Sequence, residues 1–303
     1  MSRPFSGRST TPTRRGFLQV AAASTIAVVS RSMADEPKPA ERSRSNKGRI
    51  FKADKGGGIG KDQASMVATL TKYRDLGFDG IEGGSPEIPD IAALNAAMKE
   101  TGFPVHGIVD GIHWKLRLSS PDEAVRQQGR EALEQAIRDA HALSASTVLL
   151  VPGRVTGEDE NHDHVWQRSI VEIRKSLPLA SRLGIRVLIE NVWNGFCEDP
   201  QQLRDYLDEI DSPWVGSYFD IGNCRKFGPA EDWIRTLGTR IVKLDVKDWG
   251  KANSFCRLGE GDVNWPEVRK ALAEIEFTGW ATREGGDRDL ADTAALMDEL
   301  LDL

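Results

Sequence analysis

Four acidic side chains in the second half of the chain are the groups best suited to carry out chemistry. Glu190, Asp220 and Glu284 each end a short run rich in β-forming residues, and Asp245 lies within a fourth such run. If the carboxylates converge, each pair 4 Å apart costs about 4 kcal/mol at an effective dielectric constant near 20. A divalent cation relieves that repulsion, and an all-oxygen ligand set suits Mn²⁺ or Mg²⁺. If they do not converge, each acid is a solvated group at a strand end.

The runs that carry these acids belong to an alternation of β-forming runs and amphipathic helical stretches that begins at residue 49. Strands that alternate with helices predict a parallel sheet. Eight such units in about 255 residues predict a single closed (β/α)8 TIM barrel, which has its active site at the C-terminal ends of the strands. The predicted strands are Arg49–Ala53, Phe78–Glu82, Val105–Val109, Thr147–Val151, Ile185–Glu190, Val215–Asp220, Ile241–Val246 and Trp280–Glu284.

The alternation of side chains along the seventh strand predicts which of its residues enter the barrel. Successive side chains of a strand point to opposite faces. If Leu244 and Val246 face the helices, then Lys243, Asp245 and Lys247 turn inward. The acids that end the fifth, sixth and eighth strands fall at a matching height. The sequence therefore predicts a metal site made of Glu190, Asp220, Asp245 and Glu284.

The N-terminus has the composition of an export signal. Arg14-Arg15-Gly16-Phe17-Leu18 precedes an apolar stretch from Val20 to Val29 and the small residues around Ala34. This order of features resembles a twin-arginine signal, and the apolar stretch is too short to span a bilayer, which takes about 20 residues. We therefore expect a signal peptide over residues 1–34, a disordered linker over 35–48 and the barrel over 49–303. The mature protein is then periplasmic or otherwise exported, without stable membrane insertion.

The charge balance excludes nucleic acid as a partner. The first 34 residues hold five of the 40 lysines and arginines and none of the 46 acids, so the rest carries a net charge of −11. Such a surface repels phosphate backbones but not a small neutral sugar. The three cysteines form no CxxC pair, which argues against a thiolate zinc site. The sequence does not decide whether any of them pair.

Four motifs resemble the xylose isomerase-like superfamily of sugar isomerases and epimerases, over essentially the whole of residues 49–303. The resemblance implies a metal held by Glu190, Asp220 and Glu284, with Asp245 where epimerases usually carry histidine. Asn223 stands where many members have a second histidine. The motifs are Leu188-Ile189-Glu190-Asn191, Phe219-Asp220-Ile221-Gly222-Asn223, Val242-Lys243-Leu244-Asp245-Val246-Lys247-Asp248 and Gly259-Glu260-Gly261-Asp262-Val263-Asn264-Trp265.

The same resemblance implies an enediolate mechanism. A divalent metal, Mn²⁺ or Mg²⁺ with Co²⁺ or Zn²⁺ as alternatives, binds the carbonyl and a neighbouring hydroxyl of the sugar. Glu190 and Glu284 are the expected proton-transfer pair as well as ligands. The expected substrate contacts are His106, Trp114, Asn223, Lys243, Lys247 and Arg257.

Two other functions fit the same residues. The first is a periplasmic lyase or hydratase that acts on keto-sugars with the same metal, which export and the missing histidines favour. The second is a non-catalytic sugar-binding barrel, against which the intact pair of Glu190 and Glu284 argues. In each case the partner is a sugar or keto-sugar, and a homo-oligomer is compatible with the sequence.

Overall fold

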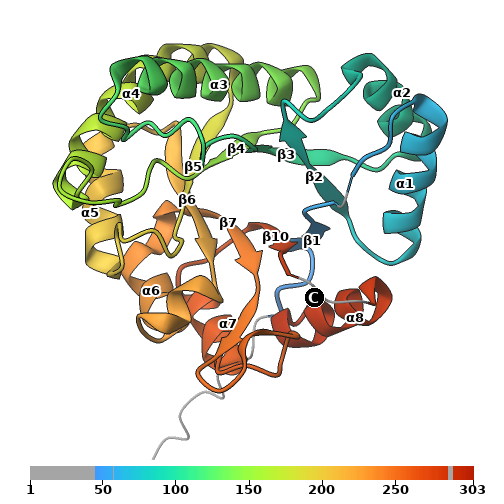
Figure 1. Cartoon of the computed structure of the whole chain (residues 1–303). Coiled ribbons are helices and arrows are strands. Elements are labelled where there is room, and N and C mark those ends of the chain that lie inside the picture. Colours follow the sequence, from blue (N-terminus) through green and yellow to red (C-terminus); the bar gives the residue numbers. More distant parts are fainter. Residues whose placement is uncertain (1–44, 57, 286–288) are drawn as a thin grey trace, which may run out of the picture. The chain divides into compact units, whose positions relative to one another are not determined.

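The structure, a computed structural model, describes residues 45–56, 58–285 and 289–303. Within these ranges, eight parallel strands close into a barrel in the order β1-β2-β3-β4-β5-β6-β7-β10, with β10 pairing back onto β1 (Figure 1). The predicted (β/α)8 barrel is confirmed, and the predicted strand ends agree to within a few residues. The strands are β1 Ile50–Asp54, β2 Gly80–Ser85, β3 Val105–Asp110, β4 Thr147–Leu150, β5 Arg186–Glu190, β6 Val215–Asp220, β7 Ile241–Val246 and β10 Gly279–Arg283.

A ring of helices surrounds the strands (Figure 1). Aspartate side chains cap the N-termini of several of them, as Asp62 does for α1, Asp90 for α2 and Asp199 for α5, because they accept the backbone N–H groups that the first turn leaves unpaired. The helices are α1 Gln63–Asp75, α2 Ile91–Thr101, α3 Glu123–Ala142, α4 His162–Leu183, α5 Pro200–Ile210, α6 Ala230–Leu237, α7 Trp265–Glu274 and α8 Leu290–Leu301.

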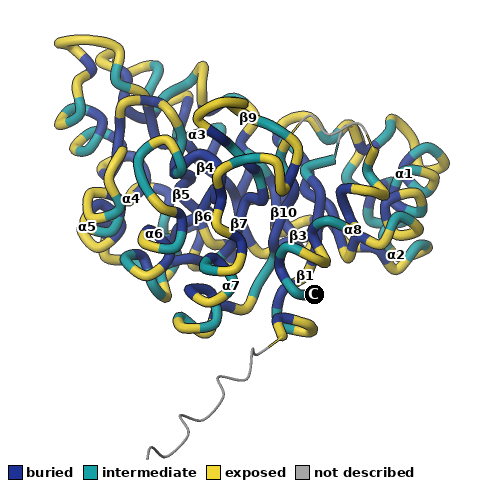
Figure 2. Tube along the Cα trace, turned by 90° about the horizontal axis from the view of Figure 1, so that it is seen from below, coloured by how far each residue is buried: buried dark blue, intermediate teal, exposed yellow. Residues whose placement is uncertain are grey.

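A short antiparallel hairpin interrupts the alternation between β7 and α7. Its strands are β8 Asp248–Gly250 and β9 Ser254–Cys256, and Figure 2 shows β9 above β7 and β10. This hairpin was not predicted from the sequence, because two strands of three residues are too short to show a period of two. The hairpin places aromatic side chains at the C-terminal ends of the barrel strands.

The register of the parallel strands brings the acids to one level. Asp220 of β6 pairs with Asp245 of β7, and Asp245 pairs in turn with Thr282 of β10. Leu244 and Val246, on either side of Asp245, are fully buried in the apolar core between the strands and the helices. The predicted inward orientation of Asp245 follows from that burial.

The expected signal peptide lies outside the described residues, as does the linker up to residue 44. The four remaining linker residues, 45–48, lead into β1, and Asn46 donates a hydrogen bond of 2.8 Å from its amide to the Leu301 carbonyl. No helix in the described part of the chain is long and apolar enough to cross a membrane.

Candidate metal centre

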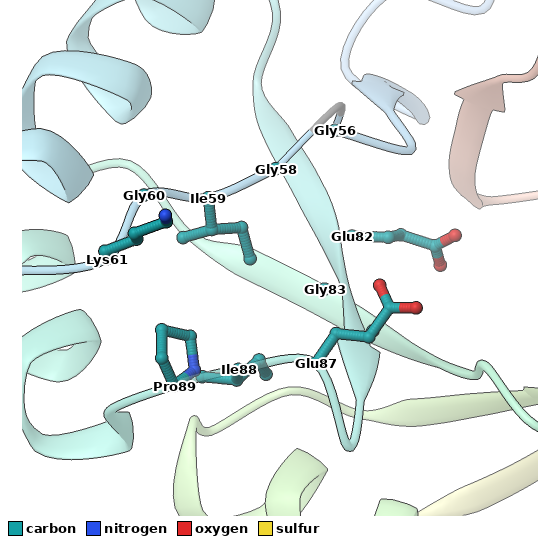
Figure 3. A pocket seen from close by; sticks show the side chains of 11 residues that line it. Gly56, Gly58, Ile59, Gly60, Lys61, Glu82, Gly83, Glu87, Ile88 and Pro89 are labelled. Atoms are coloured by element: carbon teal, nitrogen blue, oxygen red, sulfur yellow. The ribbon is translucent and has the colours of Figure 1, made fainter.

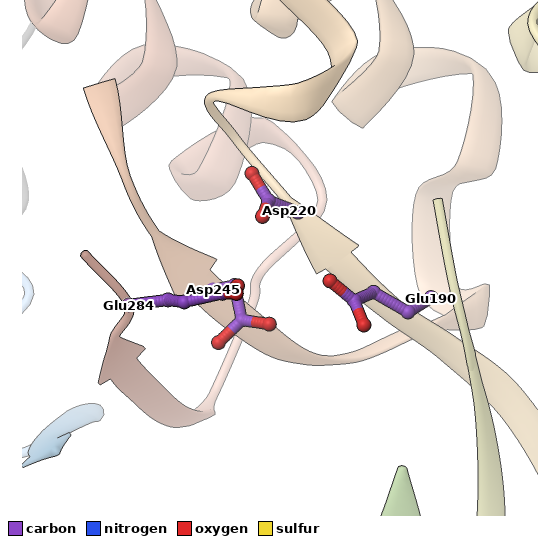
Figure 4. Close-up of side chains that lie close together, drawn as sticks. All are labelled: Glu190, Asp220, Asp245 and Glu284. Atoms are coloured by element: carbon purple, nitrogen blue, oxygen red, sulfur yellow. The ribbon is translucent and has the colours of Figure 1, made fainter. Parts of the chain in front are cut away.

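The four predicted carboxylates meet at the C-terminal ends of the strands. Glu190, Asp220, Asp245 and Glu284 each offer one oxygen, and these oxygens lie within 4.8 Å of one another. Figure 4 shows Glu190 and Glu284 approaching from opposite sides, with Asp245 and Asp220 between them. Asp220 and Asp245 are fully buried and Glu190 is 8% exposed. The barrel therefore buries three of the four acids, while the Glu284 side chain is 32% exposed.

Two lysines extend into this acid cluster. The Lys55 ammonium lies 2.7 Å from Asp245 Oδ2 and 3.1 Å from Glu284 Oε2. The Lys247 ammonium lies 3.1 Å from both Asp220 Oδ2 and Glu284 Oε2. Lys247 was predicted at the site from the sequence, whereas Lys55 was not. A signal was available, because Lys55 directly follows β1, and residues that follow barrel strands lie at the active-site end.

Burial and mutual repulsion set the protonation of the cluster. Burial, together with the neighbouring acids, raises the pKa of Glu190 to about 8 and that of Asp220 to about 6. The pKa of Asp245 is raised well above its usual value, first by burial and then by the other carboxylates. Burial also acts against ionised Glu284, but Lys55 and Lys247 outweigh it and lower its pKa to about 2. The raised pKa values of Glu190, Asp220 and Asp245 indicate that two lysines alone do not favour ionisation of all four acids.

A divalent cation fits this donor set. Two ammonium groups offset half of the formal charge of four carboxylates, and one divalent ion would balance the rest. Asp245 Oδ1 is buried and has no hydrogen-bond partner in the described part of the chain, so it has a free lone pair for a ligand bond. An all-oxygen set favours Mg²⁺ or Mn²⁺ over softer metals.

Two asparagines fix the position of Asp220. Asn191 accepts a hydrogen bond of 2.8 Å from the backbone N–H of Asp220 and donates one of 2.9 Å to its carbonyl. The Asn223 backbone N–H donates to Asp220 Oδ1 at 2.7 Å. The Asn223 side-chain oxygen accepts from Lys247 at 3.4 Å. Asn223, predicted as a substrate contact, is buried and orients both an acid and a lysine, and Asn191 was not singled out from the sequence.

Lys243 and His106 lie in a deeper layer of the barrel. They are 1% and 4% exposed, and the Lys243 ammonium is 2.6 Å from His106 Nδ1 and 3.5 Å from Glu82 Oε1. Burial lowers the pKa of Lys243 to about 8 and, together with that lysine, keeps the pKa of His106 well below its usual range. The His106 ring stacks on Trp280 with centroids 4.1 Å apart. Both predicted substrate contacts therefore sit within the barrel interior.

The other two predicted contacts lie on the surface. Trp114 is 45% exposed and packs edge-on against His113. Arg257 forms ion pairs with Asp292 and Glu260. Neither residue belongs to the acid cluster, and contact of either with the substrate stays a prediction.

A cavity of about 540 Å³ lies at the C-terminal ends of β1 and β2. Its walls are the glycine-rich loop after β1, which begins next to Lys55, and the end of β2 (Figure 3). Gly60 has a φ of +108°, and a Cβ there would lie 2.8 Å from the Met66 backbone nitrogen. That position therefore requires glycine. The lining includes the carboxylate residues Glu82 and Glu87.

Comparisons with known proteins agree with this architecture. The family model described as xylose isomerase-like TIM barrel matches residues 70–302. An L-ribulose-5-phosphate 3-epimerase of Salmonella heidelberg is 27% identical over 69% of this chain and 78% of its own length. An uncharacterised protein of Methanocaldococcus jannaschii is 27% identical over 79% of this chain and 86% of its own. The solved structure of an L-ribulose 3-epimerase superposes with a TM-score of 0.69 at 21% identity, covering 84% of this chain and 94% of the other.

Proposed function

Because the chain belongs to the xylose isomerase-like TIM barrel family, we propose that it is a divalent-metal-dependent isomerase or epimerase of a sugar. The observation that carries the proposal is the convergence of four carboxylate oxygens within 4.8 Å at the ends of four barrel strands. The named relative, a sugar epimerase, supports the same class of reaction. A bound Mn²⁺ or Mg²⁺ would polarise the carbonyl of the sugar and acidify the neighbouring C–H bond.

Glu190 and Glu284 are the proton-transfer pair. They approach the cluster from opposite sides (Figure 4), so one carboxylate can remove a proton from one face of the sugar carbon and the other can return a proton to the opposite face. That inversion is an epimerisation, whereas return of the proton to the neighbouring carbon is an isomerisation. Asp220 and Asp245 are fully buried and complete the ligand set.

Lys55 and Lys247 stabilise the negative charge that develops on the sugar oxygens. Each ammonium is already held within 3.1 Å of the carboxylates, so little reorganisation is needed when the proton leaves. Lys55, which was not predicted from the sequence, shares this role with Lys247.

Two experiments test the proposal. Metal analysis of the full chain should find about one Mn²⁺ or Mg²⁺ per molecule, and removal of the metal should abolish exchange of the sugar C–H protons with D₂O. Glu190→Gln and Glu284→Gln should each lower that exchange at least 100-fold, since general acid–base catalysis contributes about 10²–10⁴. The control Glu260→Gln, on an exposed loop, should leave it unchanged. Exchange that persists without metal would refute metal dependence.

A lyase or hydratase acting on a keto-sugar is the second candidate. Asp245 and Asn223 stand where the sequence resemblance leads us to expect histidines. A different set of side chains around the metal is compatible with elimination from the enediolate in place of return of the proton. Mass spectrometry of the reaction mixture separates the two, because elimination changes the mass of the product and epimerisation does not.

We also propose that the protein is exported by the twin-arginine route. The support is the sequence Arg14-Arg15-Gly16-Phe17-Leu18 before an apolar stretch. Replacement of both arginines by lysine should retain the protein in the cytoplasm, as measured by fractionation. Export of the double variant at the wild-type rate would contradict this route.

A further inference from the structure

An aromatic pair stands exposed beside the acid cluster. Trp193, three residues beyond Glu190 at the end of β5, and Phe255 of β9 stack with ring centroids 4.7 Å apart and planes 26° from parallel. Trp193 is 36% exposed and Phe255 is 45% exposed, so both large apolar side chains present part of their surface to solvent. We call these two side chains the aromatic wall.

The aromatic wall is held in place despite its exposure. The Trp193 indole N–H donates a hydrogen bond of 2.8 Å to the Asn223 carbonyl, and its ring packs edge-on against Trp249 at 6.1 Å. The hairpin that carries Phe255 is anchored by Asp248, a fully buried carboxylate that accepts the Gly259 N–H at 2.8 Å. A rigid aromatic surface loses little conformational entropy when a ligand stacks on it.

One lysine side chain separates the aromatic wall from the reacting groups. The Lys247 ammonium lies 4.9 Å from the centre of the Phe255 ring and 3.1 Å from Glu284 Oε2. Hairpin strand β9 lies above β7, the strand of Asp245 (Figure 2). A sugar bound at the cluster would therefore extend its far edge to the aromatic wall.

We propose that the aromatic wall stacks against the C–H face of a ring-closed sugar, and that the substrate is a keto-sugar with its carbonyl on a ring carbon. This rests on the proposed function. Aromatic faces bind flat apolar surfaces, which a pyranose ring offers and an extended chain does not. Ring closure consumes the carbonyl of an ordinary aldose or ketose. A ring-closed substrate for enediolate chemistry must therefore bear a second carbonyl.

This substrate class differs from that of the named relative. L-ribulose 5-phosphate, named for the Salmonella protein, cannot close a furanose ring because its 5-oxygen carries the phosphate. The reaction on a ring keto-sugar stays balanced without a co-reactant, because a carboxylate takes the proton beside the carbonyl and a carboxylate returns one. An enzyme that oxidises a sugar-ring hydroxyl must supply the substrate.

The test uses the full chain with Mn²⁺ and two probes, methyl 3-oxo-β-D-glucopyranoside and L-ribulose 5-phosphate. Proton exchange in D₂O gives kcat and KM, and quenching of tryptophan fluorescence gives the dissociation constant. Trp193→Ala and Phe255→Leu should each raise KM and the dissociation constant for the glycoside roughly fivefold with kcat nearly unchanged. Phe255→Tyr retains the aromatic face and should behave as the wild type. Phe51→Ala, which removes a 41% exposed ring near the start of β1, should have no effect.

Three outcomes would overturn the proposal. Unchanged KM in Trp193→Ala and Phe255→Leu, with Glu190→Gln inactive, would reject the aromatic wall and leave the proposed function intact. Turnover of L-ribulose 5-phosphate without binding of the glycoside would reject the substrate class. A smaller particle for Trp193→Ala in light scattering, with sugar binding unchanged, would make the aromatic wall an interface between copies of the chain.

Discussion

Lys55 and Asp245 form a salt bridge of 2.7 Å between residues 190 positions apart in the chain. Strand β10 lies between their strands, β1 and β7, in the barrel, so the lysine reaches past a whole strand to meet the acid. Asp245 is fully buried, and the Lys55 side chain is 23% exposed. The loop at the end of the first strand thus supplies positive charge to acids at the ends of the last strands.

Replacement of Lys55 by methionine should therefore destabilise the metal-free protein. The variant leaves the buried Asp245 without its strongest partner, and breaking a buried pair in this way costs about 3 kcal/mol. For a domain of this size the melting temperature should fall by roughly 5–10 °C. Thermal unfolding with and without Mn²⁺ measures the effect. Mn²⁺ should restore more stability to Lys55→Met than it adds to the wild type, because the ion supplies the missing charge.

Lys61→Met is the matched control for this variant. Lys61 lies six residues further along the same loop and is exposed, so its removal should change the melting temperature by less than about 1 °C. Equal melting temperatures for all three proteins without metal would mean that Lys55 does not compensate the acids.

Asp248 should be required for the order of the hairpin beside the metal centre. Its carboxylate accepts hydrogen bonds from the Trp249 N–H at 2.9 Å, the Gly259 N–H at 2.8 Å and the Trp265 indole at 3.1 Å. Asp248→Ala leaves these donors unpaired in a buried site and should cost about 3 kcal/mol in urea unfolding. Asp248→Asn retains one acceptor oxygen and should lose less. A variant Asp248→Ala as stable as the wild type would show that water replaces the carboxylate.

The barrel and its four acids were predictable because both depend on regular patterns in the sequence, namely the alternation of strands with helices and the alternation of side chains along a strand. Parallel strands end at one edge of the barrel, and alternation along β7 placed Asp245 inside between the buried Leu244 and Val246. Alternation gives the face of the sheet but not the depth. Lys243, two residues earlier on the same face, was therefore expected at the mouth and lies beneath it, 1% exposed.

The positions of residues on loops could not be predicted from the sequence, for a different reason. Trp114 and Arg257, expected to contact substrate, lie outside the acid cluster, and their positions depend on how long loops pack, which no period in the sequence records. The aromatic pair of Trp193 and Phe255 comes from a loop and a hairpin 62 residues apart and could be recognised only once the barrel had brought them together. Lys55 was missed only because the residues after β1 were not considered.

The depth of Lys243 leads to a prediction that separates substrate binding from stability. Lys243→Met removes the partner of buried Glu82 and should destabilise the protein by about 3 kcal/mol, as breaking a buried pair does. The double variant Lys243→Met with Glu82→Gln should recover part of that loss, because no buried charge remains unpaired. KM for the sugar should stay within twofold of the wild type in both. An increase in KM of tenfold or more would place Lys243 in contact with the substrate after all.

The pH dependence of stability should reveal Asp110 at the end of β3. Burial raises the pKa of this carboxyl from 3.8 to about 6, although the Ile112 backbone N–H partly opposes the shift. The folded state therefore retains the proton between about pH 4 and pH 6 while the unfolded state releases it. The contribution of Asp110 is fully present below pH 4 and is lost as the pH rises through 6. A difference of about two pKa units corresponds to about 3 kcal/mol.

Asp110→Asn isolates this contribution, because asparagine has a similar shape and does not titrate. Urea unfolding of both proteins at pH 4, 5, 6 and 7 gives the difference in unfolding free energy at each pH. The contributions of the other titrating groups are the same in both proteins and cancel in this difference. Relative to the wild type, the variant should gain about 3 kcal/mol between pH 4 and pH 7. A difference that stays constant with pH would mean that Asp110 is ionised in the folded protein throughout this range.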